Sequence, residues 1–308
     1  MTERLIWERD GPGWPNHAAS RFVSAGGLRW HVQMMGEGPI LLLLHGTGAA
    51  THSWRTLAPI LSRRFTVVAP DMPGHGFTEA PLSSDMSIVG MSRLVGDLVA
   101  TLDVKPRFAV GHSAGAAILC RMSLDGAIEP DRLVSLNGAL LPFPFLAGRV
   151  FSPMAKMMFW NPVISVPRLF AWLAADRSVV ERTLRGAGSH IDRQGIDCYA
   201  QLFRDRGHVT ATLAMMAHWD LKALRWDLPR LQSRLILITA KDDRAIPPRD
   251  AFTVRDIVPG ARVVMLRRGG HLLHEERPHE VGDLLIATMS GDQTDSPSPS
   301  ASQISGMG

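Results

Sequence analysis

A serine lies between two glycines where an apolar stretch ends, and this spacing predicts a nucleophile. Residues 109–116 read Ala-Val-Gly-His-Ser-Ala-Gly-Ala, so that Gly111 and Gly115 flank Ser113. A sharp turn from strand to helix holds such a serine in a strained backbone conformation and leaves no room for a side chain at the flanking positions. The turn would expose the Ser113 hydroxyl at its tip. The alternative is a glycine-rich turn in which the serine only caps a helix.

A serine hydroxyl attacks efficiently only when a histidine takes its proton and a carboxylate orients that histidine. Both residue types follow Ser113 along the chain. Asp242 and Asp243 come after a β-rich run that ends at Thr239, and His271 comes after the next such run. Because open α/β sheets build their sites at the carboxyl ends of strands, these side chains are predicted to converge. His271 is the predicted base, and either aspartate could be the acid.

Two backbone N–H groups are needed to stabilise the oxyanion that forms when serine attacks a carbonyl. Ala114, directly after the nucleophile, is predicted to supply one of them. Thr47 is predicted to supply the other, because it lies in a glycine-rich loop after the apolar run 40–44, which has the pattern of a fully buried strand.

The chain also carries fragments of motifs typical of other chemistries. Gly46 and Gly48 follow a strand, with Asp71 about 20 residues further on, so a dinucleotide-binding turn is an alternative. The third glycine of that motif is missing. The spacing of His274 and His279 is one residue too long for the helical zinc motif and is interrupted by a proline. The chain also has no Gly-Lys pair and hence no Walker loop. We predict no metal site and no cofactor.

Eight β-rich runs set the expected architecture, an α/β fold with an eight-stranded, mostly parallel sheet. They lie near 20–24, 28–34, 40–45, 65–70, 107–111, 132–137, 234–240 and 262–267. No β-rich run occurs over 141–228, which predicts a helical cap inserted after the sixth strand. The core domain would comprise 1–140 and 229–290. Residues 291–308 are rich in serine, proline and glycine and are predicted to be disordered.

The predicted cap is rich in large, adaptable side chains. Those expected to face a bulky hydrophobic substrate are Met157, Trp160, Trp172, Met216 and Trp219. Methionines and aromatic residues at helical spacing are more often ordinary core, which is the alternative.

Composition excludes several classes of protein. The 308 residues have a formal charge of +4 and 45% hydrophobic composition, as expected for a globular domain. No basic stripe with interleaved aromatics supports nucleic-acid binding. Cys120 and Cys198 are too few for a disulfide framework, the N-terminus has no apolar segment typical of a signal peptide, and no apolar run is long enough to span a membrane. We expect a cytoplasmic protein, and peripheral membrane association is left open.

Taken together, these loops make residues 20–290 resemble the α/β-hydrolase superfamily. In that superfamily the acid is followed by two residues, an aliphatic residue and a proline. Asp243, followed after two residues by Ile246 and Pro247, fits this pattern. The resemblance thus favours Asp243 as the acid and leaves Asp242 as a surface or turn residue.

A narrower resemblance is carried by residues 7–11, 14–16, 27–33, 45–49, 111–117 and 133–141. We call the serine turn at residues 111–117 the elbow. These segments are similar to the magnesium-chelatase accessory proteins of bacteriochlorophyll biosynthesis. The resemblance implies a phototrophic bacterium, magnesium-chelatase subunits as partners, and a role near magnesium insertion into protoporphyrin IX. Without a Walker loop the chain cannot be the ATP-driven motor, so the role would be accessory.

Three functions remain in competition. The first is a serine hydrolase acting on an ester or acyl bond of a bulky hydrophobic substrate, with a tetrapyrrole as one candidate. The second is a non-catalytic scaffold or tetrapyrrole-binding partner of magnesium chelatase, since fold does not settle function. The third is a carbon–carbon bond hydrolase or a general carboxylesterase. Branches with an aspartate nucleophile are disfavoured because the elbow carries Ser113.

Overall fold

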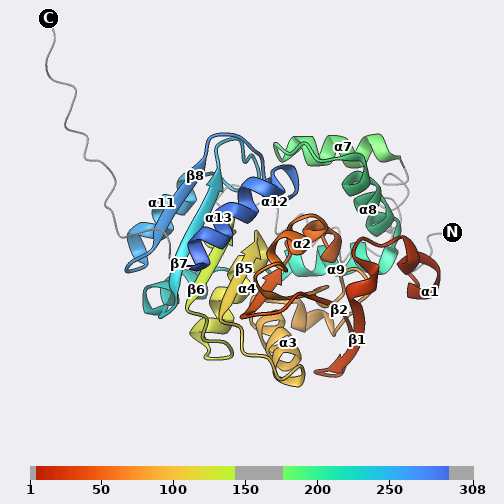
Figure 1. The fold of residues 1–308 in the computed structure, drawn as a ribbon, viewed down its shortest axis with the longest axis horizontal. Helices are drawn as coiled ribbons and strands as arrows, with labels where there is room; N and C mark the ends of the chain where they lie inside the picture. The colour runs from red at the N-terminus through yellow and green to blue at the C-terminus, as the bar shows by residue number, and fades with distance from the viewer. Residues whose placement is uncertain (1–4, 143–175, 291–308) are drawn as a thin grey trace, which may run out of the picture.

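An eight-stranded sheet runs through the middle of the part of the chain described by the computed structural model, residues 5–142 and 176–290 (Figure 1). Its strands are β1 (Ser20–Ala25), β2 (Leu28–Met35), β3 (Ile40–Leu44), β4 (Thr66–Pro70), β5 (Phe108–His112), β6 (Arg132–Leu136), β7 (Arg234–Ala240) and β8 (Arg262–Leu266). Their order is β1-β2-β4-β3-β5-β6-β7-β8. Only β2 runs antiparallel to its neighbours, and all later pairs are parallel. The predicted fold class is confirmed, with every predicted strand end within one residue of the observed end.

Helices cover both faces of this sheet (Figure 1). In chain order they are α1 (Trp7–Asp10), α2 (Leu57–Leu61), α3 (Ile88–Thr101), α4 (Ala114–Leu124), α11 (Arg249–Ile257), α12 (Leu273–Glu276) and α13 (Pro278–Ser290). Five short 3-10 turns join them: η1 (Gly11–Gly13), η2 (His17–Ala19), η3 (Thr51–Trp54), η4 (Ser83–Met86) and η5 (Leu228–Arg230). Helices α3 and α4 pack together against one face, and α2 and α13 pack together against the other.

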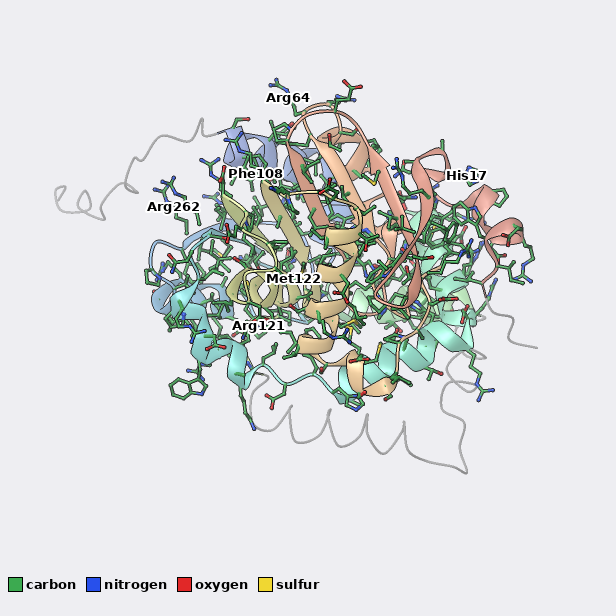
Figure 2. All side chains as sticks on the ribbon, turned by 90° about the horizontal axis from the view of Figure 1, so that it is seen from below. His17, Arg64, Phe108, Arg121, Met122 and Arg262 are labelled. Carbon is green, nitrogen blue, oxygen red and sulfur yellow. The ribbon has the colours of Figure 1, made fainter. Side chains whose placement is uncertain are left out.

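Strand β3 shows how the sheet separates two apolar cores. Leu42 and Leu44 belong to the core under α3 and α4, and Leu41 and Leu43 belong to the core under α2 and α13. Successive side chains of a strand point to opposite faces, so a strand covered on both sides must be apolar at every position. Figure 2 shows the buried residues Phe108 and Met122 among the inner side chains, with Arg64 and Arg262 at the periphery.

A run of helices follows β6 and precedes β7, as predicted for an insertion after the sixth strand. Its helices are α7 (Arg177–Gly186), α8 (Arg193–Arg204), α9 (Arg206–Ala217) and α10 (Lys222–Asp227). The first three begin at an aspartate whose side chain accepts a backbone N–H, which stabilises a helix start: Asp176, Asp192 and Asp205. We call residues 176–227 the helical insert. The expected disordered tail and part of the expected cap (143–175) lie outside the described residues, and the domain boundaries stay a prediction.

Candidate active site

Ser113 occupies a strained turn between β5 and α4. Its φ of 50° and ψ of −116° are rare for a residue with a side chain. A Cβ at Gly111 would lie 2.4 Å from the backbone nitrogen of Ala116, and one at Gly115 would lie 2.3 Å from the carbonyl oxygen of Leu44. Backbone segments therefore approach too closely for any residue but glycine at either position, and the turn leaves Ser113 partly exposed.

Asp243 and His271 are joined by a hydrogen bond between their side chains. His271 Nδ1 lies 2.9 Å from Oδ2 of the buried Asp243 carboxylate. The other carboxylate oxygen accepts the backbone N–H groups of Ala245 at 2.8 Å and Ile246 at 2.9 Å. Three donors thus fix this carboxylate. A neutral ring that donates from Nδ1 keeps Nε2 unprotonated, which is the form that accepts a proton.

The structure brings Asp243, and not Asp242, against His271. Asp242 is exposed, and its backbone N–H donates to the carbonyl of Gly269 at 3.2 Å. No hydrogen bond joins the Ser113 hydroxyl to His271 among the described residues. In free enzymes such contacts are often long and tighten only when substrate binds.

The backbone of His271 is held by two side chains that the sequence analysis missed. Its carbonyl oxygen accepts hydrogen bonds from His112 Nε2 and from Asn137 Nδ2, both at 2.9 Å. Asn137 Oδ1 also accepts the N–H of Ala240 at 2.9 Å. The only available signal was position, since His112 ends β5 and Asn137 follows β6 directly.

The loop after β3 lies against the serine turn. A Cβ at Gly46 would lie 2.8 Å from His112 Nδ1 and 3.1 Å from the Cβ of Ser113. The backbone N–H groups of Thr47 and Ala114 make no hydrogen bond to any other described residue. Two unengaged N–H groups in these positions are suited to receive an oxyanion.

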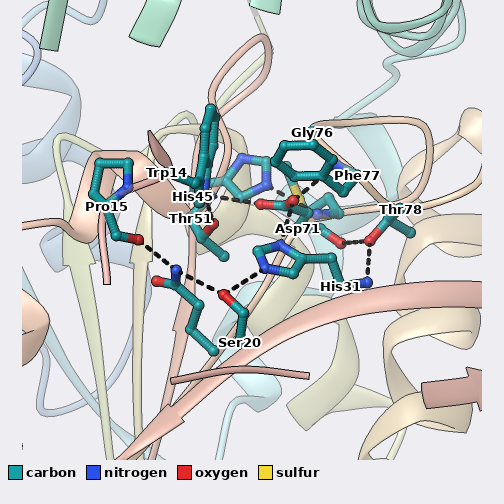
Figure 3. A network of polar contacts seen from close by, with 12 residues as sticks. Trp14, Pro15, Ser20, His31, His45, Thr51, Asp71, Gly76, Phe77 and Thr78 are labelled. Carbon is teal, nitrogen blue, oxygen red and sulfur yellow. Dashed lines mark hydrogen bonds and ion pairs between the residues drawn. The ribbon is translucent and has the colours of Figure 1, made fainter. Parts of the chain in front are cut away.

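Asp71 holds the loop after β3 in place through a buried network of hydrogen bonds (Figure 3). Its Oδ1 accepts the N–H of Thr51 at 2.6 Å, and its Oδ2 lies 2.7 Å from His31 Nδ1 and 2.9 Å from the nitrogen of Phe77. Trp14 Nε1 donates to Thr51 Oγ1 at 2.9 Å. Because all of these contacts occupy the carboxylate, the structure does not support the alternative in which Asp71 binds a dinucleotide ribose.

Two of the five predicted substrate-facing side chains lie within the described residues. Met216 is 39% exposed, and Trp219 is partly buried against the core under α3 and α4. Met157, Trp160 and Trp172 lie outside the described residues. The methionine that contacts the predicted oxyanion loop is Met215, whose sulfur lies 3.5 Å from Thr47 Oγ1. Helical periodicity was the missed signal, since His208, Ala211 and Met215 share the buried face of α9.

Buried histidines surround the site and support its loops. Burial lowers the pKa of six of them: His45, His52, His75, His112, His208 and His274. For His45 and His208 the pKa falls to about 4. The N–H of Met72 donates to His45 at 2.9 Å, and the N–H of Gly76 donates to His208 at 3.2 Å. These bonds require an unprotonated ring nitrogen, so both rings must stay neutral.

The free energy of unfolding is therefore expected to fall already in mild acid, below about pH 6.5. An unfolded histidine binds a proton below its ordinary pKa of about 6.5, whereas folded His45 and His208 bind one only near pH 4. Their contribution to stability is complete above pH 6.5 and is lost as the pH falls toward 4. Between pH 7 and pH 5 each should remove about 2 kcal/mol from the free energy of unfolding.

Urea denaturation at pH 7, 6 and 5 measures this loss. The variant His208→Gln, which keeps a polar side chain but does not titrate, should show a shallower dependence on pH. Equal free energies of unfolding at pH 7 and pH 5 in the unmodified protein would contradict the expectation.

Within residues 5–142 and 176–290, no three histidine, cysteine or acidic side chains are grouped so that they could hold a metal ion. In the same residues, no helix is both long enough and apolar enough to cross a membrane.

Comparisons with known proteins agree with this architecture. Residues 41–284 match the model of the alpha/beta hydrolase family. The chain is 36% identical to the magnesium-chelatase 30 kDa subunit of Rhodobacter capsulatus, covering 90% of this chain and 97% of that protein. It is 25% identical to a 2-hydroxy-6-oxo-2,4-heptadienoate hydrolase of Pseudomonas putida, covering 85% and 93% respectively.

Solved structures show the same fold. An α/β hydrolase fold protein from Burkholderia ambifaria matches with a TM-score of 0.73 at 21% identity, covering 87% of this chain and 97% of that one. A serine hydrolase involved in carbazole degradation matches with a TM-score of 0.71 at 22% identity, covering 88% and 98%. The family model spans most of the sheet and every loop of the candidate site, and the chain therefore belongs to the α/β hydrolase family.

Proposed function

We propose that this protein is a serine hydrolase. Ser113 Oγ attacks the carbonyl carbon of an ester or similar acyl group, and His271 Nε2 takes the hydroxyl proton. Asp243 orients His271 and stabilises its charged form, and the N–H groups of Thr47 and Ala114 hold the oxyanion. The alcohol leaves with the proton from His271, and the acyl group stays bonded to Ser113 Oγ. His271 Nε2 then takes a proton from water, whose oxygen attacks the acyl carbon. The acid leaves, and Ser113 Oγ recovers its proton from His271. The observation that carries this proposal is the 2.9 Å bond between the buried Asp243 and His271.

The cellular role that we propose is accessory to the magnesium-chelatase step of bacteriochlorophyll biosynthesis. The 36% identity to the magnesium-chelatase 30 kDa subunit over nearly the whole of both chains supports it. The substrate would be a bulky hydrophobic ester or acyl compound, a tetrapyrrole among the candidates, and magnesium-chelatase subunits are candidate partners. The exposed thioether of Met216 in the helical insert supports an apolar ligand, because such a side chain adapts to large apolar surfaces.

A second candidate is the hydrolysis of carbon–carbon bonds. It is supported by the 25% identity to the hydrolase of 2-hydroxy-6-oxo-2,4-heptadienoate. Both activities would use the same serine. Assays on an activated ester and on a ring-fission product of that class distinguish them.

Genetic complementation tests whether the chemistry matters in the cell. In Rhodobacter capsulatus lacking its 30 kDa relative, this chain is expected to restore bacteriochlorophyll, and the Ser113→Ala variant is expected to fail at equal protein level. The substitution removes one oxygen from a turn, so it should cost little stability. Pigment is measured by absorbance and protein level by immunoblot. Full restoration by the variant would favour the scaffold function. Failure of the unmodified chain and of the variant alike would contradict the proposed accessory role.

A further inference from the structure

The turn that follows α7 in the helical insert is bonded to both candidate catalytic loops. The carbonyl oxygen of Ala187 accepts the N–H of His271 at 3.3 Å and that of Arg244, next to the acid, at 3.2 Å. The hydroxyl of Ser189 accepts the N–H of Leu272 at 2.8 Å, and Ser189 is only 1% exposed. One short turn of the insert thus holds the backbone at His271 and Leu272.

The fit of this turn is tight enough to exclude side chains. Gly188 has φ +84, and a Cβ on it would lie 2.1 Å from the carbonyl oxygen of Asp242. A Cβ on Gly270, beside the base, would lie 2.1 Å from the carbonyl oxygen of Gly188. The turn therefore lies wedged between the acid loop and the histidine loop.

A second group of contacts holds the same loop at Glu275. Glu275, four residues after the base, is buried, and its Oε1 accepts the hydroxyls of Tyr199 at 2.8 Å and Ser53 at 3.0 Å. Its Oε2 accepts a hydrogen bond from Arg55, which also bonds Asp192 at the start of α8 at 2.8 Å. Tyr199 and Asp192 belong to the insert. Ser53 and Arg55 follow the oxyanion loop.

We propose that the helical insert positions the catalytic base through two hydrogen bonds, that of Ser189 to the N–H of Leu272 and that of Tyr199 to Glu275. This positioning would not depend on any contact between the insert and the substrate. We call these two contacts the insert clamp. The inference rests on the proposed function, because it assigns positioning residues to that same site. Misplacing a catalytic group by about 1 Å can lower the rate about 100-fold, even when the cause lies outside the reacting atoms.

The charges around Glu275 explain why the clamp would be rigid. Burial raises the pKa of this carboxyl, and the adjacent Arg55 opposes that rise. A buried charge must stay paired and hydrogen-bonded, so the insert cannot withdraw Tyr199 without leaving a lone pair of Glu275 unpaired. Tyr199 is the only tyrosine of the chain, and burial next to Glu275 raises its pKa well above 10.

Esters of two sizes distinguish the insert clamp from an insert that only contacts the substrate. The variants Tyr199→Phe and Ser189→Ala each remove one hydroxyl and keep the rest of the side chain. With para-nitrophenyl acetate, whose acyl group is a short acetyl, each variant is expected to lower kcat about tenfold while KM changes by less than about twofold. The same fall is expected with para-nitrophenyl laurate. The matched control is Thr183→Val, since the Thr183 hydroxyl bonds only within α7, to Val179 at 2.8 Å.

Each outcome bears on one proposal or the other. Loss of kcat on both esters in folded variants, with normal melting and a normal control, supports the clamp. Unchanged kcat on the acetate, or a loss confined to the laurate, overturns it and leaves the serine hydrolase standing. If Tyr199→Phe fails to fold, Ser189→Ala alone decides. If wild-type protein shows no Ser113-dependent turnover of either ester, the proposed function itself fails, and the clamp fails with it.

Discussion

Replacing Ser113 with alanine is expected to lower the kcat for a short activated ester by about 10⁴- to 10⁶-fold. Members of a catalytic triad act as a unit, so removing the nucleophile removes nearly all of their joint effect. The turn itself should survive, because Gly111 and Gly115 still permit the close backbone contacts. Steady-state hydrolysis of para-nitrophenyl acetate measures the change, and a fluorophosphonate probe should label the wild type and not the variant.

A serine near the end of helix α4, the helix that Ser113 precedes, provides the control. Ser123 lies at the far end of α4, where its hydroxyl is 3.0 Å from that of Ser233. Ser123→Ala should hydrolyse the ester and take the probe like the wild type. Equal turnover by Ser113→Ala and wild type would refute Ser113 as the nucleophile.

Replacing the acid with asparagine is expected to lower kcat by about 10⁴-fold at Asp243 and hardly at all at Asp242. In Asp243→Asn the amide oxygen would keep the N–H groups of Ala245 and Ile246, so the new NH₂ would face His271 Nδ1. The ring would then accept at Nδ1 and carry its proton on Nε2. That tautomer cannot take a proton from serine.

Asp242→Asn is the matched control, since it makes the same chemical change one residue away on an exposed side chain. Parallel kcat measurements on the two variants, with circular dichroism to show that both fold, decide the assignment. A severe loss in Asp242→Asn together with a mild one in Asp243→Asn would make Asp242 the acid.

Much of this site could be predicted from the sequence, because burial and close backbone contacts restrict which residue types can occupy a position. Strands covered on both faces must be apolar throughout, which made β3 recognisable. The elbow was recognisable because backbone contacts at 2.3 and 2.4 Å exclude every side chain at Gly115 and Gly111. Ser113, Asp243 and His271 follow the carboxyl ends of β5, β7 and β8, which lie in the parallel part of the sheet.

The fold, the candidate nucleophile and the order of its predicted partners follow from the pattern of residues along the chain. The side-chain contacts were needed to show that Asp243 bonds His271, and that Met215 rather than Met216 contacts the oxyanion loop. The contacts around Glu275 and Ser189 were also beyond local reasoning. Ser189 and Leu272 lie 83 positions apart, and Ser53 and Glu275 lie 222 apart. Such pairs leave no local pattern, because a buried hydroxyl or carboxylate is recognised only by the partner that packing brings to it.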